Sequence, residues 1–270
     1  MIEQRAYAAS HDFMQVARLV PTTQQVTAVP VGTQVRQALE LMGREGFDQL
    51  PVMAAGRVVG VFSYRSLARA LKYLRRNDDP LDQPVEDCVE EPGYVRASHD
   101  VGEILTLLEK DGAVLVGEES HVDAVMTSTD VMRYLWSATH PFVLLQDIEL
   151  SARSLMYQCC AEPGVLEQAL RRGLQAGRFD DPTGQPSRLE DLTYAELLGV
   201  LLQSENFGRL FADAFGRNKT LVAATLEPVR EVRNKVFHFR DEISAEELDV
   251  LVVARQYLRR RVTAAKARRS

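Results

Sequence analysis

Two short stretches of the 270-residue sequence hold side chains that can do chemistry, and the first is Thr127 with Asp130. These residues lie three positions apart at the start of a predicted helix, so a hydroxyl and a carboxylate face the same side. A helix N-terminus offers free N–H groups and a partial positive charge that suit a phosphate. The carboxylate can accept hydrogen bonds from both hydroxyls of a ribose. The pair therefore indicates a site for a nucleotide-like ligand.

The second stretch contains Arg233, Asn234 and His238. Cleavage of RNA without a metal needs a base, an acid and positive charge on the phosphorane. His238 has a suitable reference pKa, and the Arg233 guanidinium fits a phosphate. On one helix Arg230, Asn234 and His238 form a stripe, whereas Arg233 lies about 140° away from His238. One straight helix does not bring Arg233 and His238 together, but two copies across a dimer axis can.

Both stretches also have structural explanations. A threonine and an aspartate three residues apart form an ordinary helix cap without any ligand. His238 stands between two phenylalanines and equally fits a packed core histidine. Arg233 can pair with Glu231 or Asp241, and Asn234 can hold a helix break.

An internal repeat supplies the elements that must position the first stretch. Residues 29–39 match residues 95–105, which lie 66 positions further on, and residues 60–67 match residues 124–131, which lie 64 positions further on. Each copy has the order β-α-β-β-α, because apolar residues alternate in strands and recur every three or four residues in helices. A unit of about 60 residues cannot cover its own sheet, so the two copies are expected to pack together.

The predicted elements of the two copies correspond one to one. In the first copy they are Thr27–Val29, Thr33–Glu45, Gln49–Met53, Arg57–Phe62 and Tyr64–Leu74. In the second copy they are Tyr94–Arg96, His99–Lys110, Ala113–Val116, His121–Met126 and Ser128–Ser137.

The repeated unit, with its third strand running into a Gly-h-h-[Thr/Ser]-x-x-[Asp/Ser] helix start, resembles a tandem cystathionine-β-synthase (CBS) domain pair, or Bateman module. The resemblance covers roughly Val16–Ser137. It implies a regulatory sensor that binds AMP, ATP, S-adenosylmethionine or a cyclic dinucleotide between the two units. Thr127 and Asp130 would then hold the ligand. In the first copy Ser63 and Ser66 take the same positions, so the carboxylate is missing and that site is either empty or accepts a different ligand. The apolar candidates to flank a base are Val95, Ala97, Val125 and Met126.

From Pro141 onward the sequence predicts helices only. Val143–Gln158 is expected to connect the halves, and a loop is expected at Gly177–Arg188. Two capping boxes, at Thr193–Glu196 and Ser244–Glu247, open further helices. Other helices follow from the apolar faces of residues 207–215 and 222–236, with Pro228 starting a turn or a kink. These short connections predict a compact bundle.

The segment Val229–Asp241 resembles the signature of HEPN domains, which is an arginine, a polar residue and a histidine four to six residues further on. The flanking Leu192–Tyr194 and Ile243–Leu248 segments are similar to one HEPN subgroup, and the resemblance covers about residues 145–262. It implies a metal-independent endoribonuclease whose composite site, built on Arg233, Asn234 and His238, lies at a dimer interface. Other HEPN domains are inactive RNA-binding or dimerisation units.

Composition limits the function without choosing it. The net charge of −6 gives no basic surface that would announce a nucleic-acid binder, although the last 20 residues hold seven basic groups and no acidic one. Those cations either contact RNA phosphates or stabilise a helix end. Three cysteines with an adjacent pair make a poor disulfide framework, and no metal-ligand spacing is present. Without a signal peptide or a membrane span, the sequence predicts a cytoplasmic protein.

The sequence thus predicts an α+β protein with three parts. Residues 1–140 form a CBS pair, residues 141–160 a connecting helix and residues 161–270 a HEPN-like all-α bundle. The expected function is a ligand-regulated homodimer that acts on RNA, with no required cofactor and no metal. The alternative is a non-catalytic adenine-nucleotide-binding protein whose bundle dimerises and recruits a protein partner.

Overall fold

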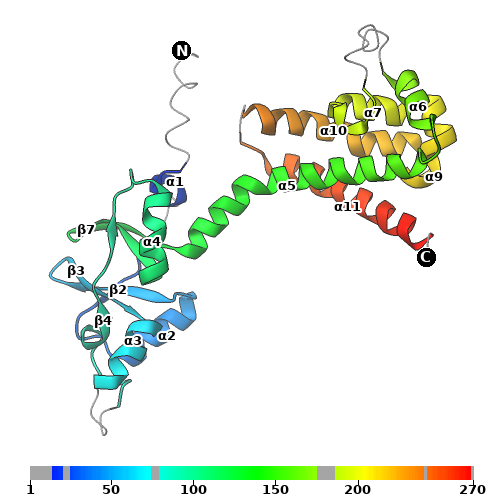
Figure 1. Cartoon of the computed structure of the whole chain (residues 1–270). Helices are drawn as coiled ribbons and strands as arrows, with labels where there is room; N and C mark the ends of the chain where they lie inside the picture. Colours follow the sequence, from blue (N-terminus) through cyan, green and yellow to red (C-terminus); the bar gives the residue numbers. More distant parts are fainter. Residues whose placement is uncertain (1–13, 21–24, 74–78, 175–185, 240–241, 269–270) are drawn as a thin grey trace, which may run out of the picture. The chain divides into compact units, whose positions relative to one another are not determined.

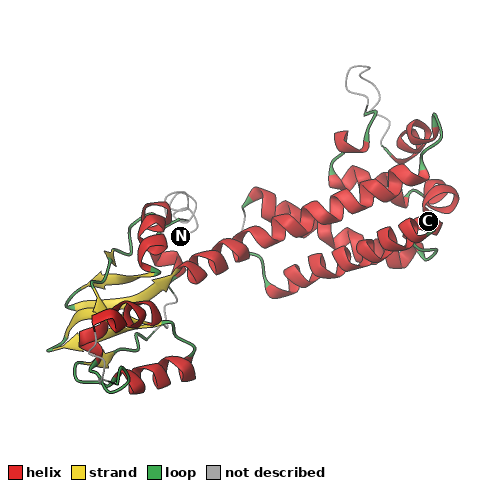
Figure 2. Cartoon of the chain, turned by 60° about the horizontal axis from the view of Figure 1, so that its bottom comes forward, coloured by secondary structure: helices red, strands yellow, loops and turns green. Residues whose placement is uncertain are grey.

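The computed structural model describes residues 14–20, 25–73, 79–174, 186–239 and 242–268. Contacts between residues divide the chain into two compact units, Met1–Leu135 and Trp136–Ser270. Within these described residues, the first unit contains both repeats and every strand, and the second is helical (Figures 1 and 2). The predicted α+β class is confirmed.

The first repeat is built around a sheet of order β1-β2-β3-β4. Its central hairpin pairs Gln49 with Ser63 and turns at Ala55 and Gly56, which both have positive φ, as tight hairpin turns require. The strands are β1 (Val29–Pro30), β2 (Gln49–Ala54), β3 (Arg57–Ser63) and β4 (Val89–Glu90), and the helices are α2 (Val35–Glu45), α3 (Tyr64–Ala70) and the 3-10 turns Leu71–Tyr73 and Val85–Cys88.

The second repeat has the same plan, with a sheet of order β5-β6-β7. Its hairpin pairs Ala113 with Thr127, which matches the pairing of Gln49 with Ser63, and both hairpins carry a register shift near their tips. The predicted β-α-β-β-α order is therefore present in both copies. The strands are β5 (Tyr94–Val95), β6 (Ala113–Glu118) and β7 (His121–Thr127), and the helices are α4 (Val101–Asp111) and the start of α5 (Ser128–Cys159).

Each repeat is completed by a segment that precedes the other repeat in the chain. Helix α1 (Val16–Leu19) lies before the first repeat but buries Val16 in the core of the second, where its N–H donates to the His99 carbonyl. Val85 lies between the repeats and is buried in the core of the first, where its N–H donates to the Thr33 carbonyl. This exchange was not predicted, and it ties the copies together through the backbone.

The second unit is an all-α bundle around one core, as the sequence predicts. The largest buried side chains include Tyr194, Phe211 and Phe215, and the Tyr194 hydroxyl donates to the Leu226 carbonyl at 2.9 Å. Its helices are the C-terminal part of α5, α6 (Val165–Gly173), α7 (Tyr194–Leu202), α8 (Ser204–Asn206), a π-helix (Phe207–Phe211), α9 (Ala212–Phe215), α10 (Lys219–His238) and α11 (Ala245–Ala267), with a 3-10 turn at Leu189–Asp191.

Two helices continue through prolines at which the sequence predicted an interruption. Ser128–Ser137 and Val143–Gln158 were expected as separate helices, but α5 runs through Pro141 without interruption. Pro228 was expected to start a turn or a kink; it lies inside α10, so the turn is absent there. A proline removes one helical hydrogen bond, and burial of the surrounding apolar side chains offsets that loss at both places. The expected loop Gly177–Arg188 lies mostly outside the described residues.

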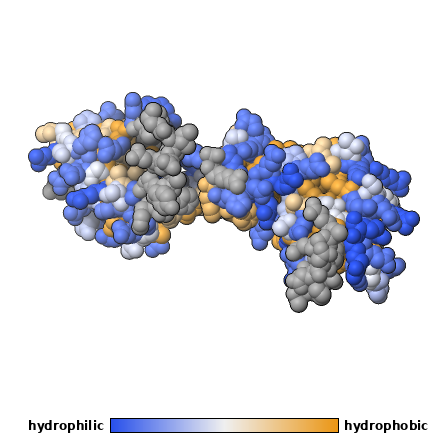
Figure 3. All heavy atoms as spheres, turned by 90° about the horizontal axis from the view of Figure 1, so that it is seen from above, coloured by the Kyte–Doolittle hydropathy of each residue, from blue (hydrophilic) through white to orange (hydrophobic). Residues whose placement is uncertain are grey.

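The surface is mainly hydrophilic on the face drawn in Figure 3, with orange apolar patches between the blue residues. Within the described ranges, no helix is both long enough and apolar enough to cross a membrane.

Candidate ligand site in the repeat pair

The second motif lies where β7 ends and α5 begins. Asp130 Oδ2 accepts hydrogen bonds from the Thr127 N–H at 2.9 Å and from its hydroxyl at 2.7 Å. In return the Asp130 N–H donates to Thr127 Oγ1 at 3.3 Å. The structural explanation, a reciprocal helix cap, is therefore correct. The cap uses one carboxylate oxygen, while Oδ1 lies 3.9 Å from Arg133 Nη1 and the Asp130 side chain is 34% exposed.

The four apolar candidates fall into two groups. Val125 shares one face of β7 with Thr127, because side chains alternate along a strand, and it is partly exposed. Met126 points to the other face and is buried in the core of the repeat with Val95. Ala97 is exposed, and its carbonyl accepts a hydrogen bond from the Ala17 N–H. Val125 and Ala97 are thus accessible, whereas Val95 and Met126 already serve the core.

The first motif, Ser63 and Ser66, forms a cap of the same kind without a charge. The Ser66 N–H donates to Ser63 Oγ at 3.0 Å, and the Ser63 N–H donates to Ser66 Oγ at 2.8 Å. The Ser66 hydroxyl also donates to the Ser63 carbonyl, and the residue is buried. Both hydroxyls are therefore committed to the start of α3.

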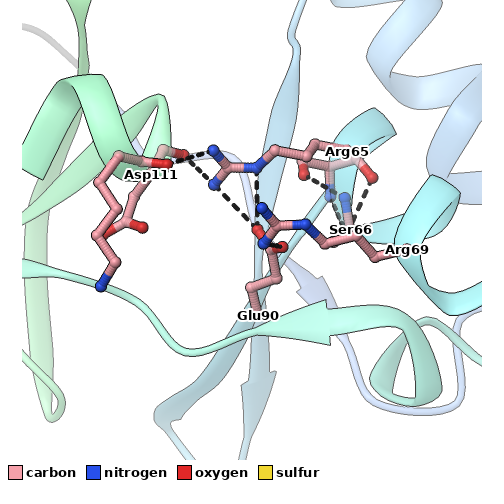
Figure 4. Close-up of polar contacts among 7 residues, drawn as sticks. Arg65, Ser66, Arg69, Glu90 and Asp111 are labelled. Atoms are coloured by element: carbon pink, nitrogen blue, oxygen red, sulfur yellow. Dashed lines mark hydrogen bonds and ion pairs between the residues drawn. The ribbon is translucent and has the colours of Figure 1, made fainter.

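A side chain that sequence analysis missed lies directly beside this first motif. The Arg65 guanidinium forms hydrogen bonds with Glu90 Oε2 and with the backbone carbonyls of Lys110 and Asp111 (Figure 4). The sequence contains one sign of it, because the two repeats differ at this aligned position: the first has the charged Arg65 and the second the uncharged Thr129.

A small cavity of about 20 Å³ borders the first motif and lies between the two repeats. Such a volume holds about one water molecule, far less than an adenosyl group needs. Residues of both repeats line it, among them Val61, Ser63, Arg65, Asp111 and Ala113. Since Val61 and Ser63 correspond to Val125 and Thr127, the repeat places the second motif on the equivalent face of the other sheet.

One buried polar atom in the second repeat lacks a partner. Among the described residues the Tyr94 hydroxyl is enclosed and makes no hydrogen bond. Burial raises the pKa of Tyr94, and the nearby Glu119 adds to the rise. Tyr94 pairs with Leu115 on the neighbouring strand β6, and its counterpart in the first repeat is Ala28. An unpaired buried hydroxyl calls for an explanation, because leaving it unsatisfied costs free energy.

The structure places Arg233 on a different face of α10 from Asn234 and His238. Arg233 Nε donates to Glu149 Oε1 at 2.8 Å, and its guanidinium lies 4.9 Å from the centre of the Phe237 ring. Asn234 is exposed within α10, and His238 is exposed at its last position. The interpretation of His238 as a core histidine is therefore wrong, and so is a helix break at Asn234.

The partner of Arg233 also differs from the sequence interpretation. It was expected to be Glu231 or Asp241, but Glu149 of α5 takes this role and also accepts from Arg153 at 2.8 Å. Asp241 lies outside the described residues. In the described parts of the chain, no group of three or more potential ligands is placed to hold a metal ion.

Comparisons with known proteins agree with the repeat. The model of the CBS domain matches residues 16–73. The chain therefore contains a CBS domain, which is followed by the second repeat with the same order of elements. A protein of Methanocaldococcus jannaschii, MJ1225, is 24% identical over 257 residues, which cover 88% of this chain and 86% of that protein.

Solved structures of CBS proteins overlap with under half of the chain. The CBS-domain protein ATU1752 from Agrobacterium tumefaciens is 17% identical, with a TM-score of 0.41 over 45% of this chain and 92% of that one. CBSX2, solved in complex with AMP, is 25% identical, with a TM-score of 0.38 over 45% of this chain and 95% of that one.

Proposed function

We propose that the repeat pair binds an adenosyl ligand at the second motif. The observation that carries the proposal is the arrangement of Thr127 and Asp130, whose cap occupies only one carboxylate oxygen. Asp130 Oδ1 would accept hydrogen bonds from ribose hydroxyls, and the first N–H groups of α5 would face a phosphate. The ligand class is AMP, ATP, S-adenosylmethionine or a cyclic dinucleotide.

Apolar side chains near Thr127 would receive the base. Val125 lies on the same face of β7, and Ala97 is exposed after β5. Val95 and Met126 would support that surface from the core rather than touch the ligand. The enclosed Tyr94 hydroxyl is a further donor within the same repeat.

The test is a thermal-shift screen of the full chain with these four kinds of ligand, followed by titration of the best one. We expect a rise in melting temperature, because a ligand that binds only the folded state stabilises it. Asp130→Asn keeps the shape of the side chain but removes its charge. Since hydrogen bonds to charged groups contribute about 1.5–3 kcal/mol, affinity should fall about 10- to 100-fold.

The matched control is Asp123→Asn on strand β7, which precedes Asp130 in the chain, and it should leave the affinity unchanged. Asp123 is exposed and pairs with His121. Equal affinity of the Asp130 variant and wild type would exclude Asp130 from the site. No thermal shift with any of the ligands would argue against binding altogether.

A second proposed function concerns the bundle, which would cleave RNA as a cytoplasmic homodimer. The observation that favours it is the exposed stripe of Arg230, Asn234 and His238 on α10. Arg233 of a second copy would supply the phosphate contact, and this requires that Glu149 share or release its guanidinium.

The test is incubation of the full chain with RNA in the presence of a chelator. Cleavage that His238→Ala abolishes and His140→Ala preserves would support the nuclease. Intact RNA under all ligand conditions would favour the non-catalytic alternative, in which the bundle dimerises and recruits a protein partner.

A further inference from the structure

Side chains of the protein itself fill the space beside the first motif. Arg65 donates to Glu90 Oε2 through Nε at 3.3 Å and through Nη2 at 3.0 Å. Arg69, one turn further along α3, pairs with the other oxygen of Glu90 (Figure 4). The Glu90 side chain is only 23% exposed. Both of its oxygens are therefore engaged at a partly buried position, where screening by solvent is reduced.

Arg65 also spans the two repeats. Its Nη1 donates to the Lys110 carbonyl and its Nη2 to the Asp111 carbonyl, both at 2.6 Å. These carbonyls belong to the last turn of α4, where unpaired acceptors and the helix dipole favour a cation. These hydrogen bonds link helix α3 of the first repeat to the C-terminus of α4 in the second repeat.

The remaining space and chemistry do not suit a nucleotide. The cavity beside Ser63 and Arg65 holds about one water molecule. Ser66 offers no carboxylate for a ribose, and its hydroxyl is committed to the cap. Both oxygens of Glu90 already pair with the guanidinium groups of Arg65 and Arg69, so Glu90 has no free oxygen for a ribose hydroxyl, and Arg65 would have to leave its partners to bind a phosphate.

We propose that Arg65 and Glu90 turn the first motif into a clamp between the repeats, so that the pair takes one adenosyl ligand per chain. This inference rests on the proposed ligand site at the second motif. Arg65 is the residue that decides the number of sites, because it both closes the first cleft and holds the second repeat against it.

The repeat itself provides the exchange that tests this inference. Thr129 and Asp130 are the counterparts of Arg65 and Ser66. The double variant Arg65→Thr, Ser66→Asp therefore gives the first motif the residues of the second. Isothermal titration of the full chain with AMP, and separately with ATP and S-adenosylmethionine, measures the number of sites.

Wild type should bind one ligand per chain and the double variant two. Adding Asp130→Asn to the double variant should return the number of tight sites to one. Two sites in wild type would overturn the inference. A folded double variant that still binds only one ligand would overturn the role of Arg65 in closing the cleft.

A measurement without ligand separates the clamp from the proposed function. Arg65→Ala and Glu90→Gln should each lower the melting temperature by about 2–6 °C, and the pair together by little more than the larger single change. Thr129→Ala, the matched control, should stay within about 1 °C of wild type. Failure of wild type to bind any probe would contradict the ligand site alone, whereas unchanged melting of Arg65→Ala would overturn the clamp.

Discussion

The first and second motifs have the same backbone geometry but carry different side chains. Ser63 and Thr127 pair with equivalent residues in their hairpins, and each begins a helix with a reciprocal cap. The second motif carries a carboxylate at Asp130 whose side chain is 34% exposed. The first carries a buried hydroxyl at Ser66, with Arg65 reaching across to the other repeat. The two repeats thus share the geometry of the cap, while Asp130 in the second motif and Arg65 with Ser66 in the first make the two motifs chemically different.

The two repeats also differ in how closely a neighbouring strand approaches the central hairpin. Gly60 of β3 lies against Val89 of β4, and a Cβ at this glycine would come within 2.5 Å of the Val89 side chain. The second repeat has Ala124 at the corresponding position, where the side chain is buried without such a conflict.

Of the stability variants considered for the two repeats, Gly60→Ala should therefore have the largest effect. The added methyl must displace β4, which also carries Glu90 of the clamp, and overpacking of this kind costs about 1–3 kcal/mol. The reverse change, Ala124→Gly, should cost about 1 kcal/mol through lost packing and added chain entropy. Chemical denaturation measures both, and equal costs at the two sites would show that β4 does not distinguish the repeats.

Much of this comparison was predictable from the sequence, because it depends on local patterns. Alternating apolar residues and the Ala54–Gly56 turn located the first hairpin, and the 64-residue offset located the second. The side-chain contacts were not predictable in the same way. Glu90 lies 25 residues from Arg65, and Glu149 lies 84 residues from Arg233. Such pairs depend on how elements that are distant in the sequence pack together, and many carboxylates could have served.

Pro141 and His238 are two places where a local sequence pattern predicted the wrong structure. A proline usually ends a helix, but burial of Leu144, Leu145 and Ile148 on the same helix outweighs one lost hydrogen bond. Aromatic neighbours suggested a buried His238, but the residue falls at the end of α10, and Phe237 and Phe239 are themselves exposed. Neighbours in sequence do not determine burial at a helix terminus.

Removal of the cap hydroxyls should have a moderate and similar effect at both motifs. Thr127→Val and Ser63→Ala each leave a helix N–H without its side-chain acceptor, and losses of about 1 kcal/mol are typical. Only the Thr127 variant should also weaken ligand binding, since its hydroxyl bonds to Asp130. Denaturation and titration on the same two variants separate capping from binding, and a loss of affinity in Ser63→Ala would contradict the assignment.

The smallest effect is expected at Tyr94, whose counterpart is Ala28. Tyr94→Phe removes an unpaired buried hydroxyl and should leave the free protein as stable as before or stabilise it by up to about 1 kcal/mol. Burial raises the pKa of Tyr94 above its ordinary value of 10.0. The folded state therefore favours the protonated form, and this contribution is present below pH 10 and is lost as the pH rises further. The Phe variant should lack that alkaline loss, which denaturation curves at increasing pH can detect.

The most direct test of the difference between the motifs is a crystal structure of the full chain grown with AMP. We expect one ligand per chain, with ribose hydroxyls within hydrogen-bond distance of Asp130 Oδ1 and with Arg65 still bonded to Glu90. Density for AMP beside Ser63, alone or together with density beside Asp130, would contradict it.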